Sequence, residues 1–383
     1  MEVVGSMMNQ QISESRNKTG QNESIVSIQI LRALAFLGIF SSHLNISEIG
    51  AWGAWGVSVF IVLSGFLMVY RYYDKSIDCS VWSAGSFAIH KIGKLYHLHI
   101  LTLIADLWLP VLFSGKKLMH TLYLERINIG LNTLLIQSWF PASSKYYSMN
   151  AVAWFLSDCL FFYFAFPYIL KFMRKLTKTV SIIVTMLLIW AAQIAISYFS
   201  YQINIPTAIS GDFGKWMTYI CPLYRLGDFC IGGMLGLFYI KYKQKVNVNK
   251  RKRQMLSSSI EIAAILVLFF TLMVNSGEIK VLSWKWFKYP KWLPASLLLV
   301  WAFAANDGVI TRSLQSNWLI KIGNLSAYAF LIHQVTINYV EKSYNYIFGT
   351  QILPIVKVSV SLIVTLFLSY AYLRTRQNRE KLT

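Results

Sequence analysis

The sequence carries little charge for its length. Of its 383 residues only 14% are Asp, Glu, Lys or Arg, whereas soluble proteins carry roughly 25%. Acidic residues are the scarcer sign, with 16 against 36 basic ones. Apolar residues make up 56% of the chain, more than a soluble core of this size needs. This balance argues against a soluble α/β enzyme and a disordered chain, and it predicts several membrane-spanning helices.

Several signatures of soluble enzymes are absent as well. The sequence has no Gly-rich phosphate loop, no GxSxG nucleophile elbow and no HExxH metal motif. Its four cysteines form no close CxxC pair, and three of them lie in apolar runs. We therefore predict unreactive core thiols, no metal site and no disulfide scaffold.

The net charge of +20 raises the question of nucleic-acid binding. The basic residues, however, lie between apolar runs and do not form a separate basic module, so we predict no nucleic-acid partner. The densest basic run, residues 250–253, reads Lys-Arg-Lys-Arg. Such a run next to an apolar segment is typical of an anchor to lipid headgroups, and the lipid bilayer is the expected partner.

Ten apolar runs approach the length of about 20 residues that a helix needs to cross a bilayer. They fall near residues 27–46, 53–71, 95–114, 152–170, 179–199, 219–240, 258–275, 292–306, 317–340 and 353–373. The sequence thus predicts an all-α integral membrane protein with about ten transmembrane helices. Residues 120–140 are amphipathic and predict an interfacial helix or part of a long loop.

Lysine and arginine set the expected orientation, because cytoplasmic loops carry them in excess. With the N-terminus inside, the predicted inner segments hold most of these residues. We therefore expect both termini in the cytoplasm, with a polar N-terminal tail over residues 1–25, a membrane domain over 26–373 and a short basic tail over 374–383. The polar N-terminal residues do not resemble a cleaved signal peptide. We therefore predict a multi-pass protein of the cell membrane.

Ionisable side chains inside spans are costly and usually face a cavity or a partner, so they form the functional shortlist. Arg32 and His43 lie eleven residues apart in the first span. That spacing puts them on one helical face, roughly 16 Å apart along the axis, with Phe36 and Ile39 between them. The alternative is that Arg32 reaches the cytoplasmic edge and His43 only ends the helix.

Four further positions within spans are candidates, each with a structural alternative. Ser64 and the glycine after it form a small notch that suits either a pocket or close helix packing. Asp158 and His333 lie in apolar helices, where each suits a ligand or a hydrogen bond to a neighbouring helix. Arg225 lies three residues before Asp228, so the two can form an ion pair on one helical face.

Lys91 and Lys94 share a helical face near the predicted cytoplasmic surface, where they suit phosphates or lipid headgroups equally well. Together, histidines and arginines inside the membrane favour acid–base chemistry on an anionic substrate. A proton-coupled transporter of an anionic or sugar substrate uses the same residue types. A glycan flippase or polymerase is a third possibility.

The segment QILRALAFLGIFSSH resembles the opening signature of the integral-membrane acyltransferase 3 family, an Arg, ten residues and a His in the first span. WGVSVFIVLSGFLM is similar to the family's segment ending in Ser-Gly-Phe. LLIQSWFP, AWFLSDCLFFYFAFP, YRLGDFCIGGMLG and LSAYAFLIHQ resemble later blocks in the family's order. The resemblance covers residues 27 to 373.

The sequence departs from the family pattern at several positions. Lys91 and Lys94 stand where arginines are usual, His97 stands where a proline is usual, and Asp158-Cys159 occupies a site at which many members have Glu. The resemblance implies transfer of an acyl group, usually acetyl, from acyl-CoA as a donor substrate, with no permanently bound cofactor. Common acceptors in the family are hydroxyls of cell-surface glycans or of their lipid-linked precursors.

The resemblance also assigns roles. It implies His43 as the catalytic base, or as a carrier of the acyl group, with Arg32 beside the reaction. Arg32 and Arg225 are expected to hold the donor's phosphates or a developing oxyanion, and Lys91 and Lys94 are expected on the cytoplasmic side, where the donor arrives. His333, Ser64 and Asp158 are expected to line the pocket.

Overall fold

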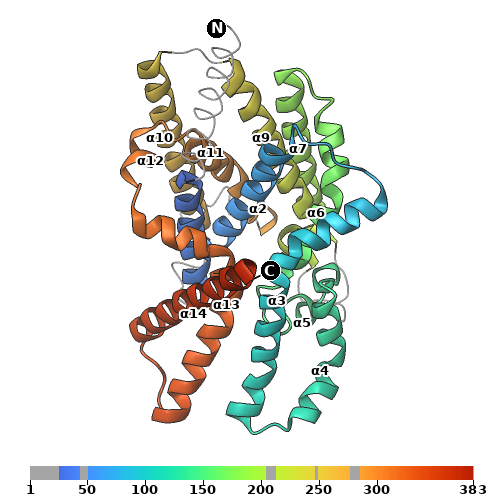
Figure 1. The fold of residues 1–383 in the computed structure, drawn as a ribbon, viewed down its shortest axis with the longest axis vertical. Coiled ribbons are helices and arrows are strands. Elements are labelled where there is room, and N and C mark those ends of the chain that lie inside the picture. Colours follow the sequence, from blue (N-terminus) through green and yellow to red (C-terminus); the bar gives the residue numbers. More distant parts are fainter. Residues whose placement is uncertain (1–25, 44–50, 204–212, 246–248, 277–284, 383) are drawn as a thin grey trace.

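The computed structural model describes residues 26–43, 51–203, 213–245, 249–276 and 285–382, which form helices and turns without a strand among them (Figure 1). The first helix is Val26–Ser42. The longer helices that follow are α2 (Ala51–Tyr72), α3 (Val81–Ser114), α4 (Leu118–Thr133), α6 (Trp154–Met173), α7 (Thr179–Gln202), α9 (Pro222–Lys245), α10 (Lys250–Ser276), α11 (Trp292–Ala305), α13 (Asn317–Phe348) and α14 (Pro354–Leu382). Short turns of helix lie between them: η1 (Gln137–Trp139), α5 (Ser143–Tyr146), α8 (Phe213–Lys215), η2 (Trp216–Ile220), η4 (Lys285–Phe287) and α12 (Val309–Ser313).

Seven described helices are long and apolar enough to cross a membrane, namely α2, α3, α6, α7, α10, α14 and the segment Phe213–Tyr242 that contains α9. They correspond to seven of the ten predicted spans. The first helix and α11 are shorter, and α13 is long but more polar. The total of ten and the orientation of the termini therefore stay predictions. The predicted tail over 1–25 lies outside the described residues, whereas residues 374–382 continue α14.

The third predicted span begins earlier than the apolar run indicates. α3 starts at Val81, because the Ser80 hydroxyl accepts a hydrogen bond from the Ser83 N–H and caps the helix. Ser80 in turn donates to Asp78, and these hydrogen bonds hold the pKa of Asp78 below its usual range. The helix ends at Gly115, whose left-handed backbone (φ 63°) is typical of a helix C-terminus. Lys91 and Lys94 thus lie within a helix, as their predicted common helical face requires.

Close contact between α2 and α9 organises the centre of the bundle. A Cβ atom on Gly65 would lie 2.0 Å from the Phe229 carbonyl oxygen, and one on Gly232 would lie 2.1 Å from the Val62 carbonyl oxygen. The two backbones therefore meet where only glycine fits. The predicted Ser64-Gly65 notch is a packing contact at Gly65, as the structural alternative proposed.

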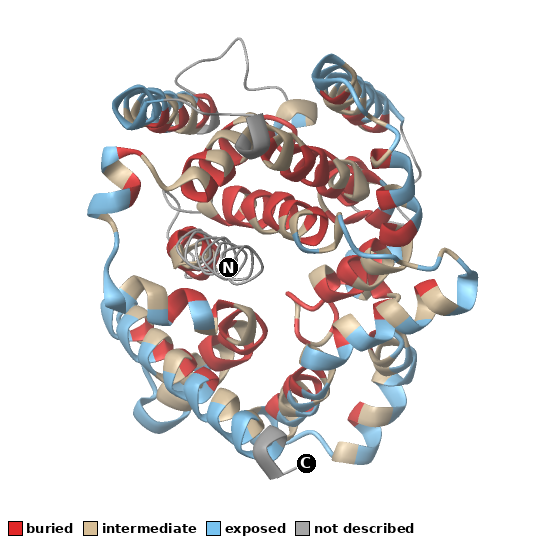
Figure 2. Ribbon diagram, turned by 45° about the horizontal axis from the view of Figure 1, so that its top comes forward, coloured by how far each residue is buried: buried red, intermediate tan, exposed pale blue. Residues whose placement is uncertain are grey.

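The outer helices have the surface of a protein surrounded by lipid. Buried residues gather in the middle of the bundle, while the outward faces of the peripheral helices are exposed (Figure 2). These faces are apolar: Leu188 of α7, Phe269 of α10 and Phe367 of α14 are all more than half exposed. Exposed apolar side chains on long helices are stable in the hydrocarbon core of a bilayer and unstable in water. The predicted integral membrane class is supported by this arrangement.

The C-terminal ends of α2, α6 and α9 lie together at one end of the bundle. Arg174, which follows α6, donates hydrogen bonds to the carbonyl oxygens of Tyr72, Tyr73 and Lys75 at the end of α2. Lys241 of α9 donates to the carbonyl oxygens of Leu176 and Thr177, each over 2.6 Å. We call this the basic end of the bundle.

Candidate functional site

The first helix carries two of the predicted site residues, and glycines hold it in the interior. A Cβ on Gly56 of α2 would lie 2.5 Å from the Ala35 carbonyl oxygen. On the other side, a Cβ on Gly323 of α13 would lie 1.9 Å from the Gln29 carbonyl oxygen. The first helix is thus packed between α2 and α13, and both neighbours contribute residues to its polar face.

Arg32 lies toward the start of this helix, half-buried among residues of three other helices. Its guanidinium interacts with Tyr163 of α6, Tyr328 of α13 and Arg71 of α2. It forms no ion pair with any described residue. Two neighbouring guanidinium groups without an acidic partner repel each other, so an anion bound between them is stabilised.

Ser64 joins the same group through Tyr163. The Tyr163 phenol interacts with the Ser64 hydroxyl, the Cys159 thiol and the Arg32 guanidinium. The structure therefore brings Ser64 and Arg32 together. We call the group formed by Arg32, Arg71, Ser64 and Tyr163 the arginine site. The sequence analysis missed Tyr163, because one tyrosine within a run of aromatic residues carries no local signal.

The two predicted lysines differ in their surroundings. Lys91 donates to the Tyr72 hydroxyl and lies over the Tyr72 ring, 4.5 Å from its centre. Lys91 therefore contacts the residue that follows Arg71 in the sequence, at the same end of α2. The Lys94 side chain is exposed, and only its carbonyl oxygen is engaged, by Arg376 at 3.1 Å. Both lysines lie toward the basic end of the bundle.

His43 and His333 are neighbours. The centres of their rings are 5.1 Å apart, although the two residues belong to predicted spans that lie far apart in the sequence. His333 is fully buried in α13 and its ring is surrounded by Phe36, Phe40 and Phe330, with ring centres about 6 Å away. An imidazole pair in an aromatic enclosure results, and we call it the histidine pair.

Arg225 and Asp228 form the ion pair that their spacing predicts. Their nearest charged atoms are 2.6 Å apart, and both side chains are buried in α9. Gln193 of α7 donates to the same carboxylate over 2.9 Å and to the Tyr224 carbonyl oxygen over 3.0 Å. The ion pair predicted as the structural alternative for Arg225 is therefore confirmed, and it uses the Nη1 atom. The Nε and Nη2 atoms of Arg225 have no hydrogen-bond partner among the described residues.

Asp158 of α6 lies in the same region as Arg225, apart from the arginine site. Its carboxylate is fully buried, and it interacts with Ser138 and Arg225. Neither of its oxygens has a hydrogen-bond partner among the described residues. The predicted candidates thus fall into three groups: the arginine site with Lys91 near it, the histidine pair, and the Asp158–Arg225 cluster.

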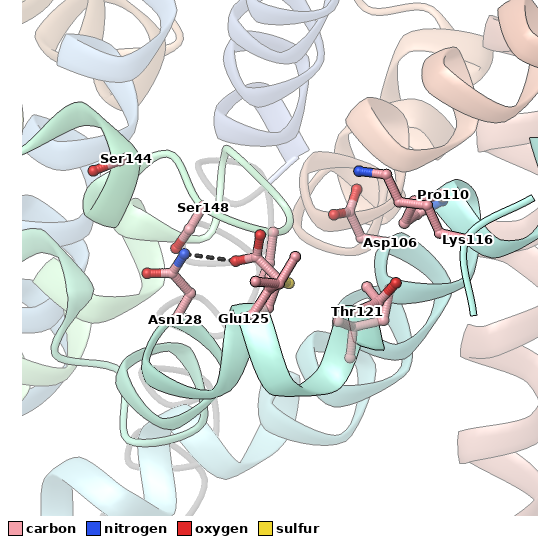
Figure 3. Close-up of a pocket in the computed structure, with 11 residues that line it drawn as sticks. Asp106, Pro110, Lys116, Thr121, Glu125, Asn128, Ser144 and Ser148 are labelled. Atoms are coloured by element: carbon pink, nitrogen blue, oxygen red, sulfur yellow. Dashed lines mark hydrogen bonds between the residues drawn. The ribbon is translucent and has the colours of Figure 1, made fainter. Parts of the chain in front are cut away.

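A polar cavity of about 310 Å³ opens beside the second half of α3. Asp106 of α3 and Glu125 and Asn128 of α4 line it, with Ser144 and Ser148 from the segment around α5 (Figure 3). Asn128 donates to Glu125 over 2.7 Å. The sequence analysis did not single out Glu125 and Asn128, because they lie on the amphipathic segment assigned to an interface or loop, and it missed Asp106 although that residue lies within the predicted span 95–114.

Two contacts place the cavity near the histidine pair. Asn150 donates to the Thr102 hydroxyl of α3 and to the Leu331 carbonyl oxygen of α13, two residues before His333. One further turn along α3, the Ala105 carbonyl oxygen accepts a hydrogen bond from Tyr339 of α13 over 2.7 Å. Asp106 therefore lies along the part of α13 that follows His333.

The described residues contain no cluster of His, Cys, Asp and Glu suited to a metal ion. His99 instead bonds through Nε2 to the Asn132 carbonyl oxygen at 2.9 Å, which ties α3 to α4. All four cysteines are free thiols, and Cys159 and Cys221 are buried. The three groups of candidates described above contain imidazole, guanidinium, ammonium, phenol, hydroxyl and carboxylate side chains.

The fold and these groups define a multi-helix membrane protein in which an unpaired arginine and a histidine lie on the same interior helix. The family model described as an acyltransferase domain matches residues 25–374, and the chain belongs to this family, acyltransferase 3. The acyltransferase MdmB of Streptomyces mycarofaciens is 25% identical over 338 residues, which cover 82% of this chain and 79% of the relative. No solved structure matches the chain. The resemblance seen in the sequence is thereby confirmed, and the chain is a membrane acyltransferase.

Proposed function

We propose that the protein transfers an acetyl group from acetyl-CoA to a hydroxyl of a cell-surface glycan or of its lipid-linked precursor, in the cell membrane. The observation that carries the proposal is the first helix, which places an arginine without an acidic partner and a histidine of the pair on one face. Eleven residues separate them, which corresponds to roughly 16 Å along the axis. A donor whose charged phosphates lie far from its reactive thioester, as in acetyl-CoA, fits that separation.

The arginine site and Lys91 are the proposed contacts of the donor's phosphates. Arg32 and Arg71 offer planar guanidinium groups that suit phosphate oxygens, and Lys91 contacts Tyr72, the residue after Arg71. Lys94 is exposed on the same helix and can reach a donor entering from solution. Because the basic end is rich in Lys and Arg, we assign it to the cytoplasm, where acyl-CoA is available.

His43 is the proposed catalytic base. It takes the proton from the acceptor hydroxyl as that oxygen attacks the carbonyl carbon of the thioester. The new C–O bond forms, the C–S bond breaks, and the proton passes from His43 to the departing thiolate. A second route has His43 attack the thioester first and carry the acyl group to the acceptor. Both routes yield the same ester and free CoA.

The polar cavity beside α3 is the proposed entrance of the acceptor. Its carboxylates accept hydrogen bonds from hydroxyl groups, and its amide and serine side chains both donate and accept. A hydroxyl-rich acceptor matches this set of groups better than an apolar one does. Since the cavity lies along α13 beyond His333, an acceptor bound there approaches the histidine pair from the side opposite to the arginine site.

The test supplies acetyl-CoA labelled in its acetyl group to membranes that contain the protein, and follows the label into glycan, lipid and protein fractions. We expect label in a glycan fraction, with release of one CoA thiol for each acetyl group transferred. Acid-stable label on the glycan without label on the protein favours direct transfer. Labelled protein that then passes its label to the glycan favours the carrier route.

Two results would contradict the proposal. Transfer only from longer acyl-CoA donors would remove acetyl as the group transferred. Uptake of a sugar or anion into vesicles, without thiol release from any donor, would favour a transporter instead.

An Asp106→Asn, Glu125→Gln variant addresses the cavity, and we expect a higher KM for the acceptor with an unchanged KM for the donor.

A further inference from the structure

The hydrogen bonds of His333 fix which of its ring nitrogens carries the proton. Its Nδ1 atom lies 2.8 Å from the Phe330 carbonyl oxygen and 3.2 Å from the Ala329 carbonyl oxygen. A carbonyl oxygen only accepts hydrogen bonds, so Nδ1 must be the protonated nitrogen. A neutral imidazole has a single N–H group, and Nε2 therefore presents a lone pair.

That lone pair lies in the interior without a recorded hydrogen bond. His333 is fully buried, and Nε2 has no hydrogen-bond partner among the described residues. Phe36, Phe40 and Phe330 surround the ring and offer no N–H or O–H group. A buried acceptor without a donor has lost its hydrogen bond to water, which makes a donor at this place favourable.

The His43 ring is the polar group recorded against His333. Its centre is 5.1 Å from that of His333, and the planes are inclined by 59°. The two rings are in contact without a hydrogen bond between them, and at this separation a rotation of the His43 ring that turns a nitrogen toward Nε2 brings the pair within range of one N–H···N hydrogen bond. Among the described residues no carboxylate acts on His333, and the titratable side chain that affects it is His43.

We propose that His333 is a positioning residue for His43. Its Nε2 atom accepts the N–H of the His43 ring, which fixes the tautomer and the orientation of His43. The other nitrogen of His43 then presents its lone pair to the acceptor hydroxyl. This assignment rests on the proposed function, in which His43 acts as the base.

The pair also stabilises the charge that forms during the reaction. When His43 takes the hydroxyl proton, its second N–H becomes a cationic donor, and a charge-assisted hydrogen bond to Nε2 is stronger than a neutral one. His333 has its own N–H engaged by backbone carbonyl oxygens, so it stays neutral while His43 becomes charged. A neutral imidazole thus has here the orienting role that a carboxylate has in many enzymes.

The first test reads the tautomers and needs no turnover. The full-length protein is purified with ¹⁵N-labelled histidine, and ring nitrogens are observed by NMR in the wild type, His43→Ala and His333→Phe. We expect His333 to be protonated at Nδ1 alone in the wild type. In His333→Phe, we expect His43 to change from one tautomer to a mixture of two. A His333 ring protonated at Nε2, or an unchanged His43 signal, would overturn the proposal even if acyl transfer is observed.

The second test uses kinetics with a graded series. His333→Phe keeps a ring but removes the acceptor, and we expect kcat to fall about a hundredfold with the donor KM unchanged. His333→Gln returns an amide oxygen near the position of Nε2 and should recover part of that loss. Thr336→Ala is the matched control, because Thr336 is buried on the same helix and bonds only to the Ile332 carbonyl oxygen.

The outcomes separate this inference from the proposed function. Equal losses in His333→Phe and Thr336→Ala would indicate helix packing and overturn the positioning role. Loss in His333→Phe with full activity in His43→Ala would make His333 the base and reverse the roles. If the wild type transfers no acyl group, the proposed function fails, while the tautomers still report whether the two rings are joined.

Discussion

At the residue scale, the most informative feature of Arg32 is that no acidic side chain pairs with it among the described residues. A guanidinium inside a membrane protein normally pairs with a carboxylate or backbone oxygens. Arg32 has two phenols and a second guanidinium around it and no acid among the described residues. Arg225, by contrast, has its carboxylate at 2.6 Å. Of these two arginines, Arg32 is thus the one whose charge is not balanced by a carboxylate among the described residues.

Replacing Arg32 by Lys tests this assignment. Lys keeps the charge but loses the planar pair of N–H donors that suits phosphate or an oxyanion. We expect kcat/KM for the donor to fall by roughly thirtyfold, equivalent to about 2 kcal/mol of a hydrogen bond to a charged group. The measurement is steady-state release of CoA thiol at varied donor concentration.

Arg126→Lys is the matched control for this substitution. Arg126 is exposed on α4 and donates to the nearby Tyr123 carbonyl oxygen, so the same change there should leave the kinetics unaltered. Wild-type kcat/KM in a folded Arg32→Lys protein would show that Arg32 does not hold the donor.

The site could be predicted from the sequence only in part. The Arg32–His43 spacing and the Arg225–Asp228 pair are local in sequence, and the spacing of a helix predicts both. The contacts of Arg32 with Tyr163 and of His43 with His333 join residues from different helices. Neither has a local signal, since a tyrosine or histidine in an apolar run packs equally well in a core.

At the element scale, glycine determines how closely the central helices approach. Gly65 and Gly232 let α2 and α9 meet backbone to backbone, and Ser64, next to Gly65, thereby faces Tyr163. Apolar runs predicted the seven clear spans well, because length and hydropathy decide that a helix crosses a membrane. They predicted the start of α3 poorly, since the apolar run begins near residue 95 although the helix begins at Val81 and includes Lys91 and Lys94.

Gly65→Ala tests the close approach of α2 and α9. The added methyl group would lie 2.0 Å from the Phe229 carbonyl oxygen, so the helices must separate. We expect a loss of about 1–3 kcal/mol in stability and reduced activity, because Ser64 moves with its helix. Thermal unfolding in detergent, followed by circular dichroism, gives the change.

Gly93→Ala serves as the control. Gly93 lies within α3, and a Cβ there would meet nothing within 4 Å. Removing a helical glycine at an open position should raise stability by up to about 1 kcal/mol. Similar stability changes for the two variants would mean that α2 and α9 are not in close contact.

At the scale of the whole molecule, the two ends of the bundle differ in chemistry. The basic end gathers the ends of α2, α6 and α9, with Arg71, Arg174 and Lys241. The cavity lined by Asp106 and Glu125 lies elsewhere, along the later part of α13. A transferase that takes its donor from one side and its acceptor from the other needs this division.

Labelling from outside the cell tests the orientation. Single cysteines replace Lys116, beside the cavity, and Lys252, in the basic run at the start of α10, on a background in which the four native cysteines are Ser. We expect a membrane-impermeant maleimide to label Lys116→Cys in intact cells, and Lys252→Cys only after the cells are permeabilised. The opposite pattern would invert the orientation and move the donor site to the outer face.

The most direct measurement of the central claim is acyl transfer by purified wild-type protein and two histidine variants. Each receives labelled acetyl-CoA and a hydroxyl acceptor identified in membranes, with folding matched by thermal unfolding. We predict transfer by the wild type, an equal rate for His97→Ala, whose histidine is exposed on α3, and a loss of at least about a hundredfold for His43→Ala. Equal transfer by folded His43→Ala would contradict the account, because the first helix would then carry no catalytic base.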